Sequence, residues 1–136
     1  MGAEMTSTLT TPERVRNRMG YSDATLTNQI IQEYIDDATA YIQRVARKTF
    51  TPADPLYELA RSVCTDLATA YAIVRPAGGV IDGLDYTIDE LKVKKSEQTK
   101  SRQRTVEKFI RFAEKGLEQL QDDDTDYPQS NTGPYG

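Results

Sequence analysis

The sequence predicts an all-α protein built as a bundle of about four helices. Apolar residues recur at steps of three and four along several segments, which is the spacing of a single helix face. Capping residues and prolines mark the ends of these segments. The chain has 136 residues, enough for one domain with a modest core. A long exposed loop before the last helix, with room for a short strand or hairpin, and an extended C-terminal tail complete the predicted fold.

The first predicted helix is short and has clear signals at both ends. Thr10 or Thr11 can cap its start, and Pro12 suits the first turn, where a missing N–H costs nothing. Glu13 can reach back as the acid of a capping box. Gly20 suits the end of the helix, because glycine adopts the left-handed backbone conformation at little cost.

The second predicted helix is long and covers residues 22–50. Ser22 or Asp23 can start it, and the pair Thr51 and Pro52 breaks it. Its apolar stripe comprises Leu26, Ile30, Tyr34, Ala38, Tyr41, Ile42 and Val45. A stripe of this length must be buried against several partners, and nothing in the segment indicates catalysis.

The third predicted helix runs from Asp54 and Pro55 to Arg75 and Pro76. It is apolar around most of its circumference, through Leu56, Leu59, Ala60, Val63, Cys64, Leu67, Ala68, Tyr71, Ile73 and Val74. We therefore expect it to be the central and most buried helix. Cys64 lies among these apolar residues, so we expect a small buried hydrophobic side chain rather than a reactive thiol.

Residues 80–96 fit a helix poorly, because Gly83 interrupts them and apolar residues are mixed with acids and lysines. We expect an exposed, extended loop with a short strand near residues 91–95. Loops of this length in small domains often carry function.

The last predicted helix begins at Thr99 or Ser101 and ends in the aspartates of residues 122–124, whose charges oppose the helix dipole. Three regions follow from these elements: a loose N-terminal arm of residues 1–10, a helical domain of residues 11–121, and a tail of residues 122–136 rich in polar residues, Pro and Gly.

Composition excludes several functional classes. The chain has no His, no Trp and a single Cys, so His-based acid/base catalysis, His-containing triads and Cys/His zinc sites are absent. We predict a protein that is not an enzyme and has no catalytic residue, no cofactor and no metal. The adjacent acids Asp36 and Asp37 lack the spacing of a calcium loop. No signal peptide or membrane span is apparent. A single cysteine cannot form a disulfide within the chain, which is consistent with a reducing cytoplasm.

Positive charge dominates one segment of a chain whose net charge is −4. Its cations are Lys92, Lys94, Lys95, Lys100, Arg102, Arg104, Lys108 and Arg111. The plain interpretation is a solvated loop and helix face. The functional alternatives are a surface that faces DNA phosphates and a surface that pairs with acidic side chains of another subunit.

The C-terminal tail contains aromatic and proline residues that solubility does not require. These are Tyr127, Pro128, Pro134 and Tyr135. Such residues can anchor a tail in pockets of a partner or add a strand to its sheet. Plain disorder is the alternative.

The order of elements resembles the head–tail connector (adaptor) proteins of long-tailed bacteriophages and related archaeal viruses. The resemblance covers roughly residues 9–121 and depends mainly on residues 11–50. In that family an opening helix is followed by the pattern D-x-x-L…I…I..A..YI....R.F. The matching residues here are Asp23, Leu26, Ile30 or Ile31, Ile35, Ala38, Tyr41, Ile42, and Arg47 to Phe50. The polar arm before Leu9 and the tail after Gln121 depart from the pattern.

The resemblance implies a structural role in the virion. Connector proteins form a ring, commonly of twelve copies, under the portal protein at the capsid vertex. The ring extends the channel for double-stranded DNA, which passes without sequence-specific binding, and joins the capsid to the next neck, stopper or tail-completion protein. Assembly would occur in the host cytoplasm, and the protein would then lie in the virion neck, with no membrane involved.

The resemblance also suggests roles for particular residues. The loop and helix residues Tyr86, Lys92, Lys94, Lys95, Lys100, Arg102 and Arg104 are candidates for a channel lining or a subunit contact. The tail residues Tyr127, Pro128, Pro134 and Tyr135 are candidates for binding the portal. DNA has to slide through such a channel, so we favour pairing of the basic segment with the acidic face formed by Glu33, Asp36 and Asp37 of a neighbour.

A small helical DNA-binding or DNA-packaging accessory protein is the alternative function. The run of cations supports it, and binding would then weaken steeply with salt. No helix-turn-helix is evident, because the third helix is too apolar to lie in a groove of DNA.

Overall fold

Four helices and one small hairpin make up the described part of the chain. The computed structural model describes the backbone of residues 9–20, 22–87 and 97–129, and the side chains of residues 9–20, 22–87 and 101–121. The elements are α1 (Pro12–Met19), α2 (Asn28–Ala46), α3 (Tyr57–Val74), β1 (Val80–Asp82), β2 (Asp85–Thr87) and α4 (Glu97–Gln129). The predicted all-α bundle of about four helices is confirmed.

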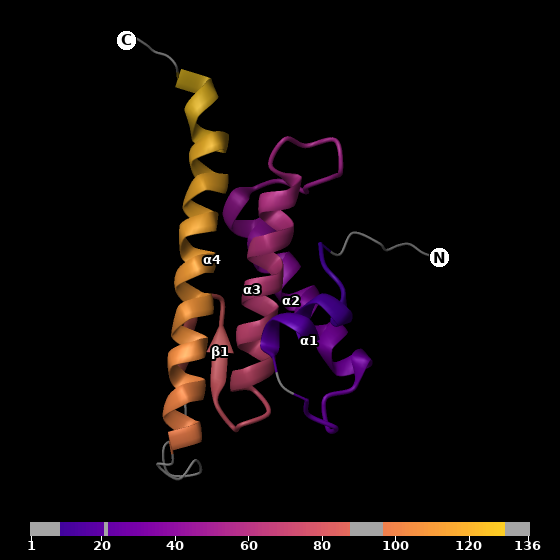
Figure 1. Cartoon of the computed structure of the whole chain (residues 1–136). Helices are drawn as coiled ribbons and strands as arrows, with labels where there is room; N and C mark the ends of the chain where they lie inside the picture. Colours follow the sequence, from indigo (N-terminus) through magenta and orange to yellow (C-terminus); the bar gives the residue numbers. More distant parts are fainter. Residues whose placement is uncertain (1–8, 21, 88–96, 130–136) are drawn as a thin grey trace.

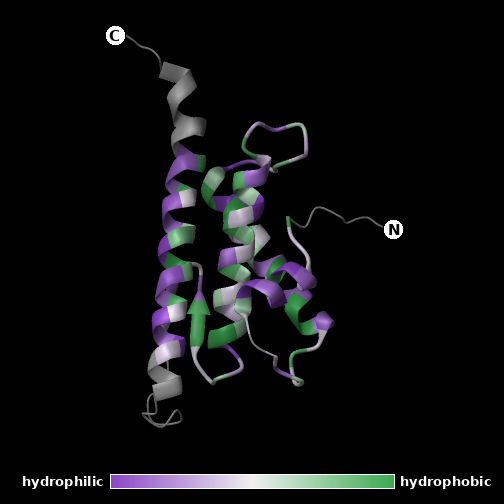
Figure 2. Ribbon diagram, viewed as in Figure 1, coloured by the Kyte–Doolittle hydropathy of each residue, from purple (hydrophilic) through white to green (hydrophobic). Residues whose placement is uncertain are grey.

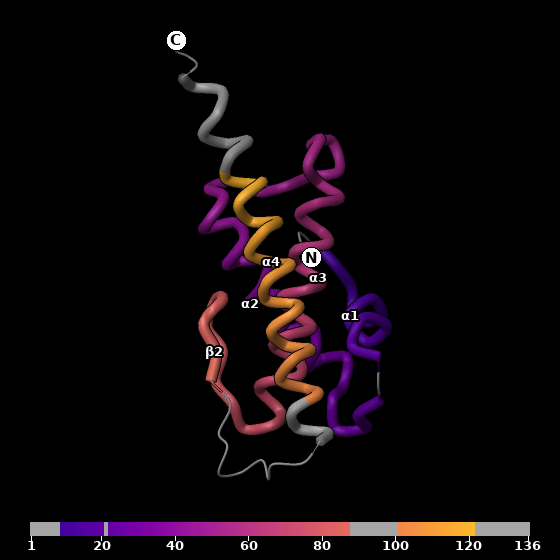
Figure 3. The backbone as a smooth tube through the Cα atoms, turned by 60° about the vertical axis from the view of Figure 1, so that its left-hand side comes forward, coloured from indigo at the N-terminus to yellow at the C-terminus, as the bar shows by residue number. Residues whose placement is uncertain are grey.

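Helix α3 lies at the centre of the bundle. Helix α4 packs along one side of α3 and runs in the opposite direction, while α1 and α2 pack on α3 from other sides (Figure 1). Figure 2 shows hydrophobic residues of α4 on the side toward α3 and hydrophilic residues on the outer side. The hairpin follows α3 and lies beside the first half of α4 (Figure 3).

The composition of α3 explains its central place. Thirteen of its 18 residues are buried, as predicted from its apolar circumference. Its alanines let neighbouring helices approach closely. The buried hydroxyls of Thr65 and Thr69 donate to carbonyl oxygens one turn earlier, at 2.8 and 2.6 Å, so these polar groups are satisfied inside the core.

The ends of α1 follow the predicted signals. The Thr11 side chain accepts a hydrogen bond from the Arg14 backbone N–H at 3.3 Å, and Pro12 occupies the first turn. Gly20 closes the helix in the left-handed conformation, with φ of 83°. Because Thr11 rather than Thr10 is the cap, Glu13 falls one position short of the capping-box site, and that part of the prediction was wrong.

Helix α2 begins later than predicted. The Thr27 side chain caps it by accepting from the Ile30 N–H at 3.1 Å. Asp23 instead accepts from the N–H and hydroxyl of Thr25, at 2.9 and 2.6 Å, and so stabilises a separate turn. The helix has 19 residues and ends before Arg47, which adopts a left-handed conformation with φ of 62°.

Helix α3 also begins later than predicted, at Tyr57 rather than at Asp54 and Pro55. The Asp54 carboxylate accepts from the Thr51 N–H at 2.8 Å and from the Lys48 ammonium at 2.9 Å. Asp54 therefore stabilises the loop between α2 and α3 instead of capping a helix. The predicted end of α3 at Arg75 is confirmed.

A two-stranded antiparallel hairpin occupies part of the predicted loop. Val80 pairs with Thr87, and Ile81 pairs with Tyr86. Gly83 turns the chain with φ of 61°, and a Cβ at this position would come within 2.6 Å of the Tyr41 ring. The predicted strand near residues 91–95 lies outside the described residues.

Helix α4 is longer at both ends than predicted. It begins at Glu97 rather than at Thr99 or Ser101, and an acid in the first turn favours this start. It continues to Gln129 and passes the aspartates of residues 122–124, which were expected to end it. Lengthening an existing helix needs no new nucleation, so unfavourable charges near its end do not have to stop it.

We predict that Gly116→Ala destabilises the protein, although alanine favours helices. A Cβ at Gly116 would overlap Cγ2 of the buried Val63, which is stiff because it is β-branched. The overlap costs about 1–3 kcal/mol, against about 1 kcal/mol gained from helix propensity. Urea unfolding should show a lower unfolding free energy for this variant, whereas Glu118→Ala at an exposed position of α4 should stay near wild type. A stabilised Gly116→Ala protein would contradict the close packing of α3 on α4.

Candidate assembly surface

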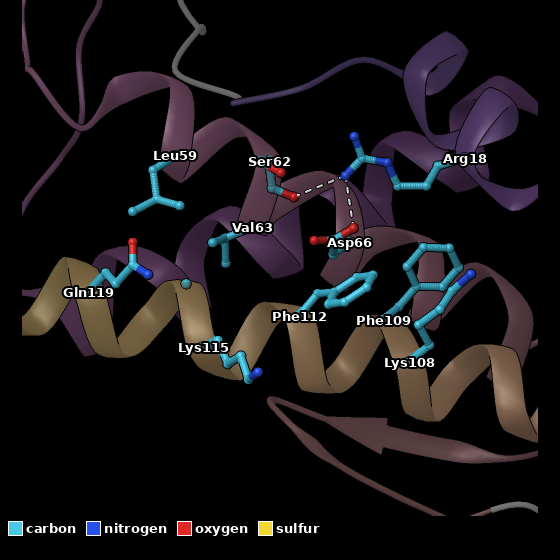
Figure 4. Close-up of a pocket in the computed structure, with 11 residues that line it drawn as sticks. Arg18, Leu59, Ser62, Val63, Asp66, Lys108, Phe109, Phe112, Lys115 and Gln119 are labelled. Atoms are coloured by element: carbon cyan, nitrogen blue, oxygen red, sulfur yellow. Dashed lines mark hydrogen bonds and ion pairs between the residues drawn. The ribbon is translucent and has the colours of Figure 1, made fainter.

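An open groove runs between α3 and α4 and has a volume of about 550 Å³. Its lining residues are Arg18 of α1, Leu59, Ser62, Val63 and Asp66 of α3, and Lys108, Phe109, Phe112, Lys115, Gly116 and Gln119 of α4. Figure 4 shows both phenylalanine side chains extending from α4 on the side that faces α3. The groove joins apolar and charged side chains from three helices.

Phe112 is the most unusual residue of this groove. Its side chain is 51% exposed, whereas Phe109, one turn earlier, is 5% exposed. The inner stripe of α4 is formed by Val106, Ala113 and Leu117, which leaves Phe112 at the edge of the helix. A large aromatic side chain half in water, beside a groove, is typical of a contact surface.

A row of cations follows the outer face of α4 next to Phe112. Arg104, Lys108, Arg111 and Lys115 are separated by steps of four, three and four residues, and all four are exposed. These steps place them on one face of the helix. Exposed acids at Glu107, Glu114 and Glu118, separated by seven and four residues, lie on the adjoining face. We call the four cations the cationic row.

An ion pair lies at the α1 end of the groove. The Arg18 guanidinium donates to the Asp66 carboxylate at 2.8 Å and to the Ser62 carbonyl at 3.3 Å (Figure 4). Asp66 is 7% exposed. Burial raises the pKa of Asp66 above its ordinary value, and the opposing effect of Arg18 only partly offsets this.

The predicted acidic face lies on α2. Glu33, Asp36 and Asp37 are exposed there, and the small Ala40 follows them on the same exposed face. Asp36 accepts a hydrogen bond from Gln32 at 3.0 Å. The buried residues of α2 point toward the core, so this face is on the outside of the bundle.

Asp37 belongs to an arginine-centred cluster that the sequence did not reveal. The Arg75 guanidinium donates to Asp37 at 2.7 Å and to the Ile81 carbonyl at 3.2 Å. It also lies 5.2 Å from the Tyr34 ring centroid and 4.6 Å from that of Tyr71. One side chain therefore ties α2, α3 and β1 together. From the sequence, Arg75 was predicted only to mark the end of the third helix, because Pro76 follows it.

Only some of the other predicted site residues have side chains that the structure describes. Tyr86 lies in β2 beside Glu107 of α4, and burial is the main cause of its raised pKa. Arg104 is exposed on α4, and Arg102 is partly buried. Lys100, Tyr127 and Pro128 belong to α4, but their side chains lie outside the described residues, as do Lys92, Lys94, Lys95, Pro134 and Tyr135 entirely. The structure thus brings Arg104 together with the rest of the cationic row.

The described side chains contain no cluster of three or more Cys, Asp or Glu residues that could hold a metal ion. Cys64 is buried and free, as predicted, and burial raises the pKa of its thiol to about 12. Such a thiol stays protonated at neutral pH and is a poor nucleophile. Within the helical residues that could be described, none of the helices is long and apolar enough to span a membrane.

Comparison with protein-family models, with curated proteins and with solved structures found no match for this chain.

We predict that Arg75→Ala lowers the unfolding free energy by about 1–3 kcal/mol, because it removes packing on two tyrosines as well as two hydrogen bonds. Asp37→Asn should cost less than about 1 kcal/mol, because Asp37 is more than half exposed. Chemical denaturation of both variants checks this order. Equal costs would show that the ion pair, rather than the stacked guanidinium, holds the cluster.

The raised pKa of Asp66 predicts a pH dependence of stability. The folded protein holds the Asp66 proton more tightly than the unfolded chain does, so this group stabilises the fold most below its ordinary pKa of 3.8. That contribution is lost as the pH rises through the raised value. Relative to Asp66→Asn, the wild-type protein should therefore gain stability as the pH falls through this window, in unfolding curves measured over a pH series. An opposite slope would mean that Arg18 dominates.

Proposed function

We propose that this protein is a structural component of a virion, a head–tail connector that forms a ring under the portal protein. The ring would extend the channel for double-stranded DNA and join the capsid to the next neck or tail protein. The observation that carries the proposal is that the domain has two unlike outward surfaces. One is the groove with Phe112 and the cationic row, and the other is the acidic face of α2.

Unlike surfaces favour head-to-tail association over pairing of identical faces. A two-fold pair made through α4 would set one cationic row against another, and one made through α2 would oppose two sets of carboxylates. Contact of α4 with α2 joins opposite charges. A repeated contact between different surfaces closes into a ring when its rotation allows.

The resemblance of the element order to connector proteins supports the choice of ring and partners. It rests on the pattern of apolar residues, so it is an argument from similarity. The fold is consistent with it, since α2 and α3 follow the expected order and a hairpin precedes the last helix.

The direct test mixes the purified full-length protein with the portal protein encoded in the same genome. We predict rings stacked on the portal in negative-stain images, at concentrations where the protein alone is a monomer or a weak oligomer. A portal of unchanged size and shape after mixing would overturn the proposal. A lysozyme-sized acidic protein without portal affinity serves as the control for crowding.

The cationic row also supports a second candidate function, that of a DNA-binding or DNA-packaging accessory protein. Four exposed cations on one helix face can contact phosphates. The neighbouring acids Glu107, Glu114 and Glu118 weaken that attraction, which is why we favour assembly. A mobility shift at low salt that disappears steeply as salt rises would favour the accessory protein, and no shift would exclude it.

A further inference from the structure

We infer that the groove between α3 and α4 binds helix α2 of a second copy of this chain, with Ala40 of one copy seated on Phe112 of the other. This inference rests on the proposed function, because it assumes that the copies form a ring. It specifies which two surfaces of neighbouring copies are in contact. The contact would repeat head to tail, because each copy offers one groove and one α2.

Shape is the first argument. Phe112 projects beside an open groove and is 51% exposed. A helix can lie over such a ring only where its own side chains are small. Ala40 is such a residue on α2. It lies at the centre of an exposed face that also carries Glu33 and Asp36, seven and four residues earlier.

Charge fixes the direction of the docked helix. When Ala40 is opposite Phe112 and the two helices run in parallel, Asp36 comes opposite Lys108, because each lies four residues earlier. Glu33 then lies close to Arg104 in the same register.

On the other side of Phe112, the parallel register places uncharged residues opposite the charged ones. Lys115 comes opposite Gln43, and Arg44 comes opposite Gly116. An antiparallel helix would instead place Arg44 opposite Lys108, which opposes like charges. It would also place Asp37 opposite Lys115, but this carboxylate already pairs with Arg75 of its own chain. The parallel arrangement is therefore the one that charge supports.

The fold provides this direction without any rearrangement. Helices α2 and α4 both run toward the end of the bundle where the loop between α2 and α3 lies (Figure 1). Copies related by rotation about an axis along the bundle keep that direction, so α2 of one copy meets α4 of the next in parallel.

Cysteine cross-linking tests the register. Asp36→Cys and Lys108→Cys proteins are mixed at high concentration and oxidised mildly, while the native Cys64 remains buried. We expect a disulfide-linked dimer from the mixture and a ladder of multimers from a chain that carries both substitutions. Asp36→Cys mixed with Glu13→Cys, at an exposed position of α1, is the matched control. Equal cross-linking of the control pair, or a predominant Asp36→Cys homodimer, would overturn the inference.

Charge reversal tests the pairing independently. Lys108→Glu and Asp36→Lys should each weaken self-association of the chain about tenfold at low salt, as measured by sedimentation, and the protein with both reversals should recover it. Arg14→Glu on α1 changes the net charge as Lys108→Glu does and should have no effect. Failure of the double reversal to recover would count against the pairing.

The two proposals fail separately. Rings on the portal without the predicted cross-links would show that the contact described here is wrong, and the connector function would stand. A cross-linked ladder without rings on the portal would support the contact and overturn the connector function.

Discussion

The close approach of α4 to α3 sets the geometry of the molecule. Gly116 has no Cβ, and this allows the backbone of α4 to lie against the Val63 side chain. Because α3 is buried over most of its length, it cannot move to accommodate a larger neighbour. The separation of the two helices in turn determines how wide the groove is and how far Phe112 stands from α3. The absence of a side chain at Gly116 therefore affects the shape of the groove on which the proposed assembly depends.

On the other side of the bundle, polar contacts add to the apolar packing of α2 on α3. Arg75 connects the end of α3 to α2 and β1, and the Tyr71 hydroxyl donates to the Gly83 carbonyl at 3.2 Å. These bonds hold the hairpin against the helices although only Ile81 of its strands is buried. A two-stranded hairpin is marginal by itself in water, so its position depends on these contacts. The acidic face of α2 is anchored by the same cluster through Asp37.

The sequence predicted the features that depend on neighbouring residues and missed those that depend on packing. The sequence offered Thr10 or Thr11 as the start of α1 and Gly20 as its end, and the structure selects Thr11. The apolar circumference of α3 correctly indicated a central helix. Asp and Thr are both residue types that favour a helix start, and only the hydrogen bonds show that Thr27 caps α2 while Asp23 bonds to Thr25. The exposure of Phe112 was not predicted, since it depends on how α4 turns against α3. The sequence predicted a run of cations up to Arg111, with a solvated loop and helix face as its plain interpretation, but this run did not include Lys115, which completes the cationic row.

The loop between α2 and α3 has a consequence for contacts at its end of the bundle. It contains no glycine, it begins at Arg47 in a left-handed conformation, and Asp54 binds both Thr51 and Lys48. Phe50 within it is 4% exposed. A loop fixed in this way has already lost most of its conformational entropy during folding. A partner that abuts this end would meet a preorganised surface, and little further ordering would oppose binding.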